Sequence, residues 1–525
     1  MICALAAVTL LASCAVFGGG DDENLSGEPE PTSPDAVITF MPIPAAVPDG
    51  DGRFSLRYNK NATFNPLVGT DTDNMLASGL MYESLFVLNA DFSWSNRLCE
   101  SYETDDAVTY DFTFVEGILH SDGTELSPYD FVYSLNTARR NSKYVRRLRN
   151  IDTVSVVGSR VIRVTLKAPD ARLPALLDIP IIKDGTAGTA PRGTGPYKYD
   201  EEGAEPMLVK NEYYRAVSSV PVDRVYLVTC TDAEMGERFT ERVVDLFIDD
   251  PNGTTTAVRR DHETRYYDTT VLQFIGFNPR AAAIDNAQFR TVISLAVDRE
   301  AIVRDILGAR ATVAPLALPM AYRLYDKTWE DAQTGDTLTR MSELLTQMGL
   351  ADADSDTYLE FPIDGEYIPF SLDFIVSNEN AARAAAAKCV ADALRHVGIN
   401  VTLRELAFSD FEIALEAGNY DLYYGETKIT ANFDFSPLIA PGGSLNFGGI
   451  SGYGTELDAF AAARGDFAER NAARELVIRI RDEVPFVPIA YLQYAIHSGR
   501  NEITGIIPSQ SGIFWNVADW EIDVK

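Results

Sequence analysis

Two kinds of apolar pattern alternate along the chain. Residues 161–166 and 224–228 place apolar and polar side chains at alternate positions, which is typical of half-buried strands. Residues 381–397 are rich in alanine and predict a helix that Gly398 ends, and residues 400–403 then predict a strand. A succession of helix, glycine and strand is typical of layered proteins. The sequence therefore predicts an α/β fold.

A further helix is predicted after residue 285. Either Asp285 or Asn286 can cap its amino end, and Gly308 ends it. Asp298 and Arg299 fall in its interior, where an ion pair or helix packing explains them better than ligand binding does. The apolar positions of this helix recur at helical spacing: Phe289, Val292, Ile293, Ala296, Ile302 and Ile306.

The first seventeen residues carry no charge and differ in character from the rest of the chain. Residues 4–11 are apolar, and Leu11-Ala12-Ser13-Cys14 resembles a bacterial lipobox, in which a peptidase cuts before the cysteine and the thiol then carries a lipid. We therefore expect residues 1–13 to be a signal peptide and Cys14 to be lipidated. An ordinary secretory signal is the alternative, and the lack of Lys or Arg beside Met1 leaves open a start further upstream.

Residues 14–51 are predicted to form a disordered tether. The stretch from 15 to 36 contains three consecutive glycines, three prolines and six acidic residues, with no basic residue. Such a stretch cannot bury enough apolar surface to offset the entropy of an ordered chain. The globular part is expected to begin near Phe54.

Composition narrows the class of protein. A length of 525 residues predicts about two to four domains, and 46% apolar residues are enough for packed cores. Asp and Glu number 77 against 45 Lys and Arg, a formal charge of −32. Such a charge repels phosphate backbones, so no nucleic-acid partner is expected. No run of about 18 apolar residues follows residue 17, so no spanning helix is expected within the body.

Motifs for catalysis or metal binding are absent. The sequence has no G-x-x-x-x-G-K-S/T phosphate loop, no H-E-x-x-H zinc helix and no G-x-S-x-G elbow. The four histidines are far apart, and Cys99, Cys230 and Cys389 form no C-x-x-C pattern, so free thiols are expected. We therefore expect a protein that is not an enzyme and has neither a metal site nor a cofactor.

Several segments together resemble one family. Residues 116–123 (Glu-Gly-Ile-Leu-His-Ser-Asp-Gly) and 126–135 are similar to the "G-v-x-F-H-D-G … A-x-D-V-x-x-S" stretch of extracellular solute-binding proteins of family 5, the peptide and nickel receptors of ABC importers. The resemblance covers roughly residues 52–520. Further matching segments follow the order of the family: 58–85, 192–197, 277–300, 344–349 and 445–458.

The resemblance implies a two-lobed periplasmic-binding-protein-like α/β fold. Crossing strands would join the lobes, and a third, smaller α+β domain would be inserted in the first lobe. Ligand would lie between the lobes, which close over it by a hinge. The implied boundaries are 52–84, 200–272 and 488–525 for lobe I, 85–199 for the inserted domain, and 273–487 for lobe II.

The resemblance also implies a function and partners. We expect a monomeric, lipid-anchored receptor on the extracytoplasmic face of the membrane that captures peptides and delivers them to ABC permease subunits. Two alternatives stay open: the same scaffold binding a non-peptide solute such as a nickel chelate or a sugar, and a peptide sensor or surface chaperone without transport.

The implied ligand site lies in lobe II. Peptide receptors of the family hold the α-ammonium with the Asp of a "W-x-A-D-Y-x-D-P" segment, which corresponds here to residues 429–437. Ile429 stands in place of the Trp and Asn432 in place of the Asp, so Asp434 and Glu426 are the remaining candidates for the anchor, with Asp434 preferred. In an extended segment Asn432 and Asp434 would share a face; the alternative is that Asp434 caps a turn before Pro437. The candidate ligand-binding residues are Asp434, Asn432, Phe433, Glu426, Tyr424, Thr72 and Asn74.

Two other features receive a structural interpretation. Gly193, Gly195 and Pro196 predict a tight turn in which glycine supplies a positive φ. A basic run stands out in so acidic a chain, and we interpret it as a solvated helix face paired with local acids, with docking on a permease or on lipid headgroups as the alternative. The run consists of Arg139, Arg140, Lys143, Arg146, Arg147 and Arg149.

Overall fold

The structure is a computed structural model that describes residues 51–250, 256–280, 282–330 and 337–524. The predicted signal peptide, Cys14 and the predicted tether up to residue 50 lie outside the described residues. The described residues belong to one compact unit. None of the described helices is long and apolar enough to cross a membrane.

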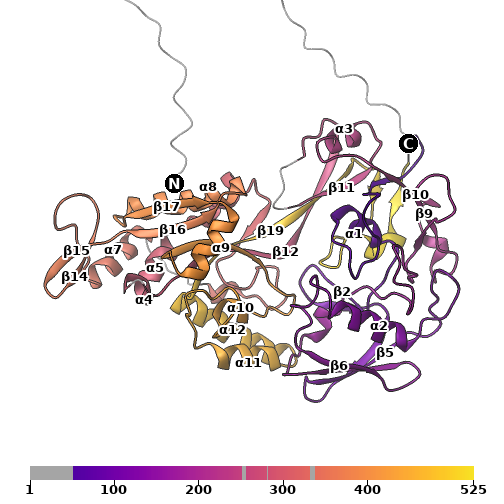
Figure 1. The fold of residues 1–525 in the computed structure, drawn as a ribbon, viewed down its shortest axis with the longest axis horizontal. Coiled ribbons are helices and arrows are strands. Elements are labelled where there is room, and N and C mark those ends of the chain that lie inside the picture. The colour runs from indigo at the N-terminus through magenta and orange to yellow at the C-terminus, as the bar shows by residue number, and fades with distance from the viewer. Residues whose placement is uncertain (1–50, 251–255, 281, 331–336, 525) are drawn as a thin grey trace, which may run out of the picture. The chain divides into compact units, whose positions relative to one another are not determined.

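One large mixed sheet organises this unit (Figure 1). Its order is β17-β16-β18-β12-β19-β11-β1-β10-β9-β8, and β13 also pairs with β19. The three strands at one end, β17, β16 and β18, are parallel to one another, as are β10, β1 and β11, whereas β12 and β19 are antiparallel to their neighbours. The strands are β1 (Ser55–Arg57), β8 (Tyr197–Tyr199), β9 (Met207–Lys210), β10 (Arg224–Val228), β11 (Leu246–Asp249), β12 (His262–Phe277), β13 (Ala311–Val313), β16 (Leu372–Ser377), β17 (Val401–Leu406), β18 (Leu422–Lys428) and β19 (Phe486–Gly499).

Two long strands connect the ends of this sheet. β12 has 16 residues and β19 has 14, and they pair from His262 opposite Gly499 to Gly276 opposite Phe486. The carboxyl-terminal half of β12 also pairs with β18, while the other end of β19 pairs with β11. The two strands therefore carry the chain between the two parallel groups, as crossing strands do.

Smaller sheets accompany the large one. A four-stranded antiparallel sheet has the order β4-β5-β7-β6 and consists of β4 (Cys99–Glu103), β5 (Thr109–Phe114), β7 (Val161–Leu166) and β6 (Ile151–Val156). Three two-stranded sheets complete the set: β2 (Phe86–Leu88) with β3 (Trp94–Asn96), β14 (Glu360–Ile363) with β15 (Glu366–Pro369), and β20 (Ile503–Thr504) with β21 (Glu521–Ile522).

Helices connect and cover the strands. The α-helices are α1 (Thr72–Ser78), α2 (Pro128–Ala138), α3 (Met235–Thr240), α4 (Ala282–Asp285), α5 (Ala287–Ala296), α6 (Arg299–Ala301), α7 (Thr337–Gln347), α8 (Ala381–His396), α9 (Phe408–Ala417), α10 (Ser436–Ile439), α11 (Gly454–Ala462) and α12 (Asp466–Glu483). The 3₁₀ helices η2 (Leu173–Leu176), η3 (Val217–Ser219), η5 (Lys327–Trp329) and η6 (Phe514–Asp519) and the π-helix η4 (Ile302–Ile306) complete the set.

The four-stranded sheet and α2 lie within residues 85–199, where the inserted domain is predicted. Ser127 and Asp130 form a capping box at the start of α2, and Pro128 occupies its first turn, where a missing N–H costs nothing. The helix packs on β6 and β7 through a face that includes the buried Phe131 and Leu135. The exact domain boundaries stay a prediction.

Several predicted elements are confirmed. β7 and β10 have the predicted bounds, and alternate residues of β7 are buried. α8 and β17 follow one another as predicted, with Gly398 in a left-handed conformation (φ +85°) between them. The amide oxygen of Asn286 accepts a hydrogen bond from the backbone N–H of Gln288, so Asn286 caps α5. The three described cysteines are free thiols.

The continuous helix predicted through Ile306 is wrong. α5 ends at Ala296, Val297 is extended, and Asp298 caps α6 by accepting the backbone N–H of Ala301 at 2.9 Å. Arg299 donates from Nε to the carbonyl of Pro488 at 2.8 Å. This hydrogen bond to the start of β19 holds Arg299 in place just after the break between α5 and α6. The spacing of apolar residues in the sequence could not predict the break.

The predicted role of the glycines before Pro196 is also wrong. Neither Gly193 nor Gly195 has a positive φ. A Cβ on Gly195 would lie 2.5 Å from the carbonyl carbon of Met81, and one on Gly193 would lie 2.3 Å from its oxygen. Close approach of two backbones therefore explains both glycines.

Candidate functional site

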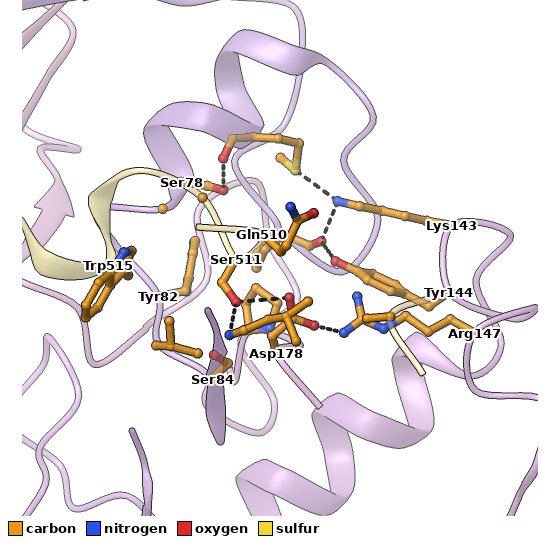
Figure 2. A pocket seen from close by; sticks show the side chains of 18 of the residues that line it. Ser78, Tyr82, Ser84, Lys143, Tyr144, Arg147, Asp178, Gln510, Ser511 and Trp515 are labelled. Carbon is orange, nitrogen blue, oxygen red and sulfur yellow. Dashed lines mark hydrogen bonds and ion pairs between the residues drawn. The ribbon is translucent and has the colours of Figure 1, made fainter. Parts of the chain in front are cut away.

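A cavity of about 530 Å³ includes Thr270 of β12 in its lining. Figure 2 shows side chains that line it. Four stretches of chain contribute most of its lining: residues 66–88, 142–147, 428–431 and 510–515. The stretch 428–431 continues from β18, whereas 510–515 leads into η6. The volume lies within the range of pockets that bind small-molecule ligands.

Aromatic side chains form part of the cavity wall. Tyr82 and Tyr144 are largely buried, and their hydroxyls donate to the carbonyls of Pro191 and Pro66, each at 3.0 Å. Trp515 is more exposed and donates from Nε1 to Ile507 O at 2.7 Å. Figure 2 shows Tyr82 and Trp515 across the cavity from Tyr144. These bonds fix the rings, so each presents a rigid apolar surface.

Arg147 and Asp178 form an ion pair in the wall. The Nε of Arg147 donates to Leu176 O at 3.0 Å, and burial lowers the pKa of the guanidinium to about 10. The hydroxyl of Ser511 donates to Asp178 at 3.1 Å and accepts from the backbone N–H of Leu88 at 2.7 Å. Asp178 is thus already paired and bonded.

Lys143 lies beside this pair. Its Nζ donates to the carbonyls of Pro66 and Gly69, both at 3.0 Å, and lies 3.3 Å from the sulfur of Met75. Burial, with repulsion from Lys428 and Arg147, lowers the pKa of Lys143 to about 8. Three acceptors thus surround this ammonium, and all of them are neutral.

Lys428 ends β18 and also lines the cavity. Solvent reaches its side chain, yet protein atoms on several sides weaken its hydration. Its pKa is lowered by this burial and by Arg147, and Asp250 partly offsets the effect at longer range. Arg146, which is exposed, lines the same cavity.

Among the described residues, two carboxylates line the first cavity, Asp178 and Glu83. Glu83 is buried and accepts from Arg97 at 2.6 Å and from both Nη atoms of Arg215 at 2.6 and 2.7 Å. The hydroxyl of Thr194 also donates to it at 3.0 Å. Glu83 is therefore fully engaged with protein groups.

A second cavity of about 440 Å³ adjoins the first and shares Arg146, Arg147 and Thr430 with it. Asp434 lines this second cavity. Its carboxylate pairs with Arg149 and accepts the backbone N–H of Ser436 at 2.9 Å. The capping of the turn before Pro437 is therefore present, and Asp434 as ligand anchor stays a prediction.

Asn432 and Phe433 lie next to Asp434 in the second cavity. The amide of Asn432 donates to Asp170 at 2.7 Å, and burial raises the pKa of that carboxyl. Phe433 is fully buried, with its ring 5.0 Å from that of Phe92, and its φ is +53°. The predicted extended backbone at this segment is therefore wrong, although Asn432 and Asp434 still line one cavity.

The four other predicted site residues line neither cavity. Glu426 accepts from the side chain of Gln273 at 3.0 Å, and the hydroxyl of Tyr424 donates to the same side chain at 2.8 Å. Burial raises the pKa of Tyr424. Asn74 is buried and bonds the backbone of residues 59–62, whereas Thr72 is exposed at the start of α1. Their binding roles stay predictions.

The basic run predicted as a solvated helix face has a different structure. α2 ends at Ala138, and residues 139–150 form turns and bends. Lys143, Arg146 and Arg147 line the first cavity, whereas Arg149 pairs with Asp434. The sequence signal for this part of the site was the cluster of basic residues itself. Lys428 and residues 510–515 offered no comparable signal.

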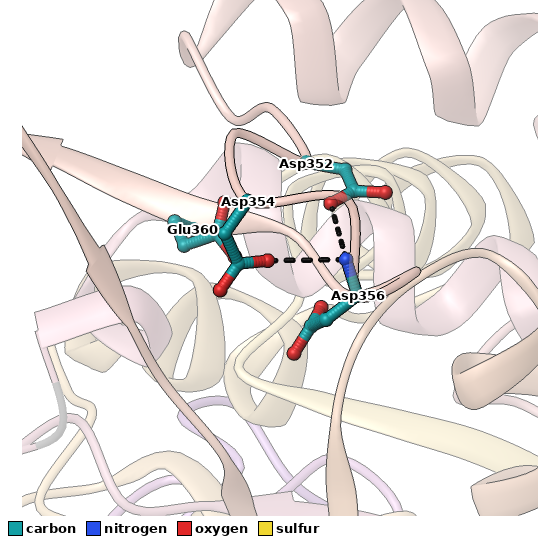
Figure 3. A group of neighbouring side chains, drawn as sticks. All are labelled: Asp352, Asp354, Asp356 and Glu360. Carbon is teal, nitrogen blue, oxygen red and sulfur yellow. Dashed lines mark hydrogen bonds between the residues drawn. The ribbon is translucent and has the colours of Figure 1, made fainter.

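Four acidic side chains that line neither cavity form a group of their own. Figure 3 shows this group. Oxygens of Asp352, Asp354, Asp356 and Glu360 lie within 4.8 Å of one another. The carboxylates of Asp352 and Asp354 accept the backbone N–H of Asp356, each at 3.1 Å, and Glu360 accepts that of Ala353 at 2.7 Å. These bonds shape the loop before β14.

Comparison with known proteins identifies the family. The sequence profile described as bacterial extracellular solute-binding proteins, family 5 Middle, matches residues 93–443. The chain belongs to this family. Its members are bacterial extracellular solute-binding proteins.

This solute-binding protein is similar to glutathione-binding proteins of several bacteria. The glutathione-binding protein GsiB of Salmonella typhi is 23% identical over 316 residues, which cover 56% of this chain and 61% of that protein. The match thus spans less than two thirds of the relative.

Solved structures confirm the two-lobed periplasmic-binding-protein-like α/β fold. The oligopeptide-binding protein AppA from Bacillus subtilis, in complex with a nonapeptide, has a TM-score of 0.61 at 18% identity, covering 90% of this chain and 99% of that one. A nickel ABC transporter protein from Bacillus halodurans has a TM-score of 0.71 at 16% identity, covering 88% and 98%. At these identities the likeness shows the fold.

Proposed function

We propose that this solute-binding protein is a receptor that captures short peptides and delivers them to an ABC permease. The observation that carries the proposal is the 530 Å³ cavity, whose wall combines fixed aromatic rings with charged groups. A peptide has apolar side chains and a carboxylate end, and the rings and basic groups of this wall match them.

The two adjoining cavities suggest how a peptide would lie. Thr430 and Arg146 line both, so a ligand longer than one residue could extend from one into the other. We propose that Asp434 holds the α-ammonium in the second cavity. To bind the ammonium, the carboxylate of Asp434 has to give up its ion pair with Arg149. The two cationic partners bind a carboxylate with similar strength.

The proposal includes the location of the receptor. Lipidation at Cys14 would attach it to the extracytoplasmic face of the membrane, and the stretch up to residue 51 would act as a tether. We propose that it acts as a monomer and binds its ligand without chemical change.

A thermal-shift assay tests the proposal. A pool of short peptides should raise the melting temperature as its concentration increases, because ligand binds the folded state alone. Mass spectrometry should then recover the peptides intact. Cleaved peptides, with contaminating peptidase excluded, would indicate an enzyme, and no shift with any peptide would contradict the peptide receptor.

A further inference from the structure

Positive charge is concentrated in the first cavity of an otherwise acidic protein. The chain carries a formal charge of −32. Among the described residues, the ionised groups that line the cavity are two carboxylates, Glu83 and Asp178, and five basic side chains. The basic side chains are Arg97, Lys143, Arg146, Arg147 and Lys428.

The two carboxylates are already neutralised by protein groups. Glu83 is held by Arg97 and by Arg215, which reaches it from outside the lining. Asp178 is held by Arg147. These pairs account for Arg97 and Arg147, so they explain part of the basic wall by ordinary structural ion pairing.

Lys143, Arg146 and Lys428 are not accounted for in this way. Within the described part of the chain, no carboxylate lies at ion-pair distance from any of them. All three residues are exposed, and Lys143 in addition donates to two backbone carbonyls that suit a structural role.

Such an arrangement is unfavourable in the empty protein. Burial weakens the hydration of Lys143 and Lys428 and lowers the pKa of each, and repulsion from Arg147 adds to the effect at both. Lys428 also repels Lys143, whereas Asp250 offsets part of the effect at Lys428. An anion placed among Lys143, Arg146 and Lys428 would be attracted by their charges and would reduce the repulsion between them.

We propose that the cavity selects anionic ligands, and that the substrate class of the receptor is acidic peptides whose carboxylates lie among Lys143, Arg146 and Lys428. This inference rests on the proposed peptide function. It also agrees with the lining, because an ammonium or a basic side chain placed there would meet no available carboxylate among the described residues.

The test uses two peptide pools that differ in charge alone. Tripeptides X-Glu-Glu and X-Gln-Gln, with a mixed first residue, have nearly the same shape, and citrate serves as an anion that is not a peptide. Isothermal titration with the full-length protein should show X-Glu-Glu binding at least about tenfold tighter than X-Gln-Gln. The preference should shrink as salt concentration rises.

Matched variants locate the effect. Lys428→Gln and Arg146→Gln should each weaken X-Glu-Glu by about fivefold or more and leave X-Gln-Gln nearly unchanged. Lys388→Gln is the control, because Lys388 lies on α8, pairs with Asp392 and lines neither cavity. It removes the same charge and should leave both affinities unchanged; an equal loss in all three variants would contradict a local site.

The outcomes separate this inference from the proposed function. Equal affinity for the two pools would overturn the selection of anions and leave the peptide receptor standing. Binding of citrate alone, weakened by Lys428→Gln, would support the anion site and contradict the peptide function. No binding of any probe would overturn the inference, and a broad peptide pool in the thermal-shift assay would then decide the peptide function by itself.

Discussion

Charged side chains in confined places decide what the two cavities can hold. In the first, Glu83 and Asp178 are bound to arginines, so the groups left to meet a ligand are cationic. In the second, Asp434 is paired with Arg149, and we propose that the ammonium of a ligand would displace this arginine. A zwitterionic peptide with acidic side chains would satisfy both cavities.

The role of Asp434 is testable by a double-mutant cycle. A charge-assisted hydrogen bond to an ammonium is worth about 1.5–3 kcal/mol, so Asp434→Asn should weaken binding of a free-amino peptide by about tenfold to more than a hundredfold. Acetylation of the peptide's amino terminus should cost the wild type as much and the variant little. Equal losses in both proteins would mean that Asp434 does not touch the ammonium.

The carboxyl of Asp245, which lines neither cavity, is expected to make the stability of the protein depend on pH. Burial, with a contribution from Asp51, raises the pKa of Asp245 to about 7. Between about pH 4 and 7 the folded state then keeps a proton that the unfolded state releases, so the free energy of unfolding falls as pH rises, by up to about 4 kcal/mol. Asp245→Asn keeps an oxygen to accept the N–H of Ser55 but cannot ionise.

This variant should lose less stability than the wild type between pH 5 and pH 8. The measurement is the melting temperature of each protein at both values. If the two proteins show the same difference between pH 5 and pH 8, Asp245 is not the group responsible.

Helices and strands that depend on the sequence pattern of a few neighbouring residues could be predicted. Features that depend on contacts between distant residues could not. β7, β10 and α8 depend on alternation, helical spacing and a terminal glycine, all of which lie within a few residues. The break between α5 and α6 depends on a contact of Arg299 with Pro488, 189 positions away. The partner of Asp434 is 285 positions away, and the cavity itself assembles four separate stretches of chain. The fold could be predicted from the family resemblance. Which charged side chains lie together at the site could be seen only in the three-dimensional structure.

The close contact between Gly195, just before β8, and the backbone of Met81 leads to a prediction about stability. Gly195→Ala would place a Cβ 2.5 Å from the backbone of Met81, so we expect a loss of about 1–3 kcal/mol from overpacking. Gly188→Ala is the matched control, since its Cβ would meet nothing within 4 Å and its φ is not positive. Urea denaturation measures both; equal stability of the two variants would contradict the backbone contact.

At the scale of the whole molecule, the net charge of the protein and the charge of its first cavity have opposite signs. The chain as a whole is strongly acidic, whereas the lining of the first cavity is basic. Distant anions are therefore repelled by the net charge, and selection of an anionic ligand would come from short-range contacts within the cavity.

The predicted anchor is tested by fractionating cells. Cys14→Ala should leave the body folded and move the protein from the membrane fraction to the soluble or secreted fraction, because lipid attachment needs the thiol. Wild-type protein that is already soluble, with an amino terminus other than Cys14, would contradict the lipobox interpretation.

Native mass spectrometry of the purified full-length protein tests the central claim most directly. A receptor with a high-affinity cavity should carry ligand through purification, and we predict that the bound mass corresponds to intact short peptides rich in Asp or Glu. The same peptides should be absent from protein that is unfolded, washed and refolded, and should rebind when returned. A bound compound that is not a peptide, or protein that neither carries a ligand nor binds added peptides, would contradict the account.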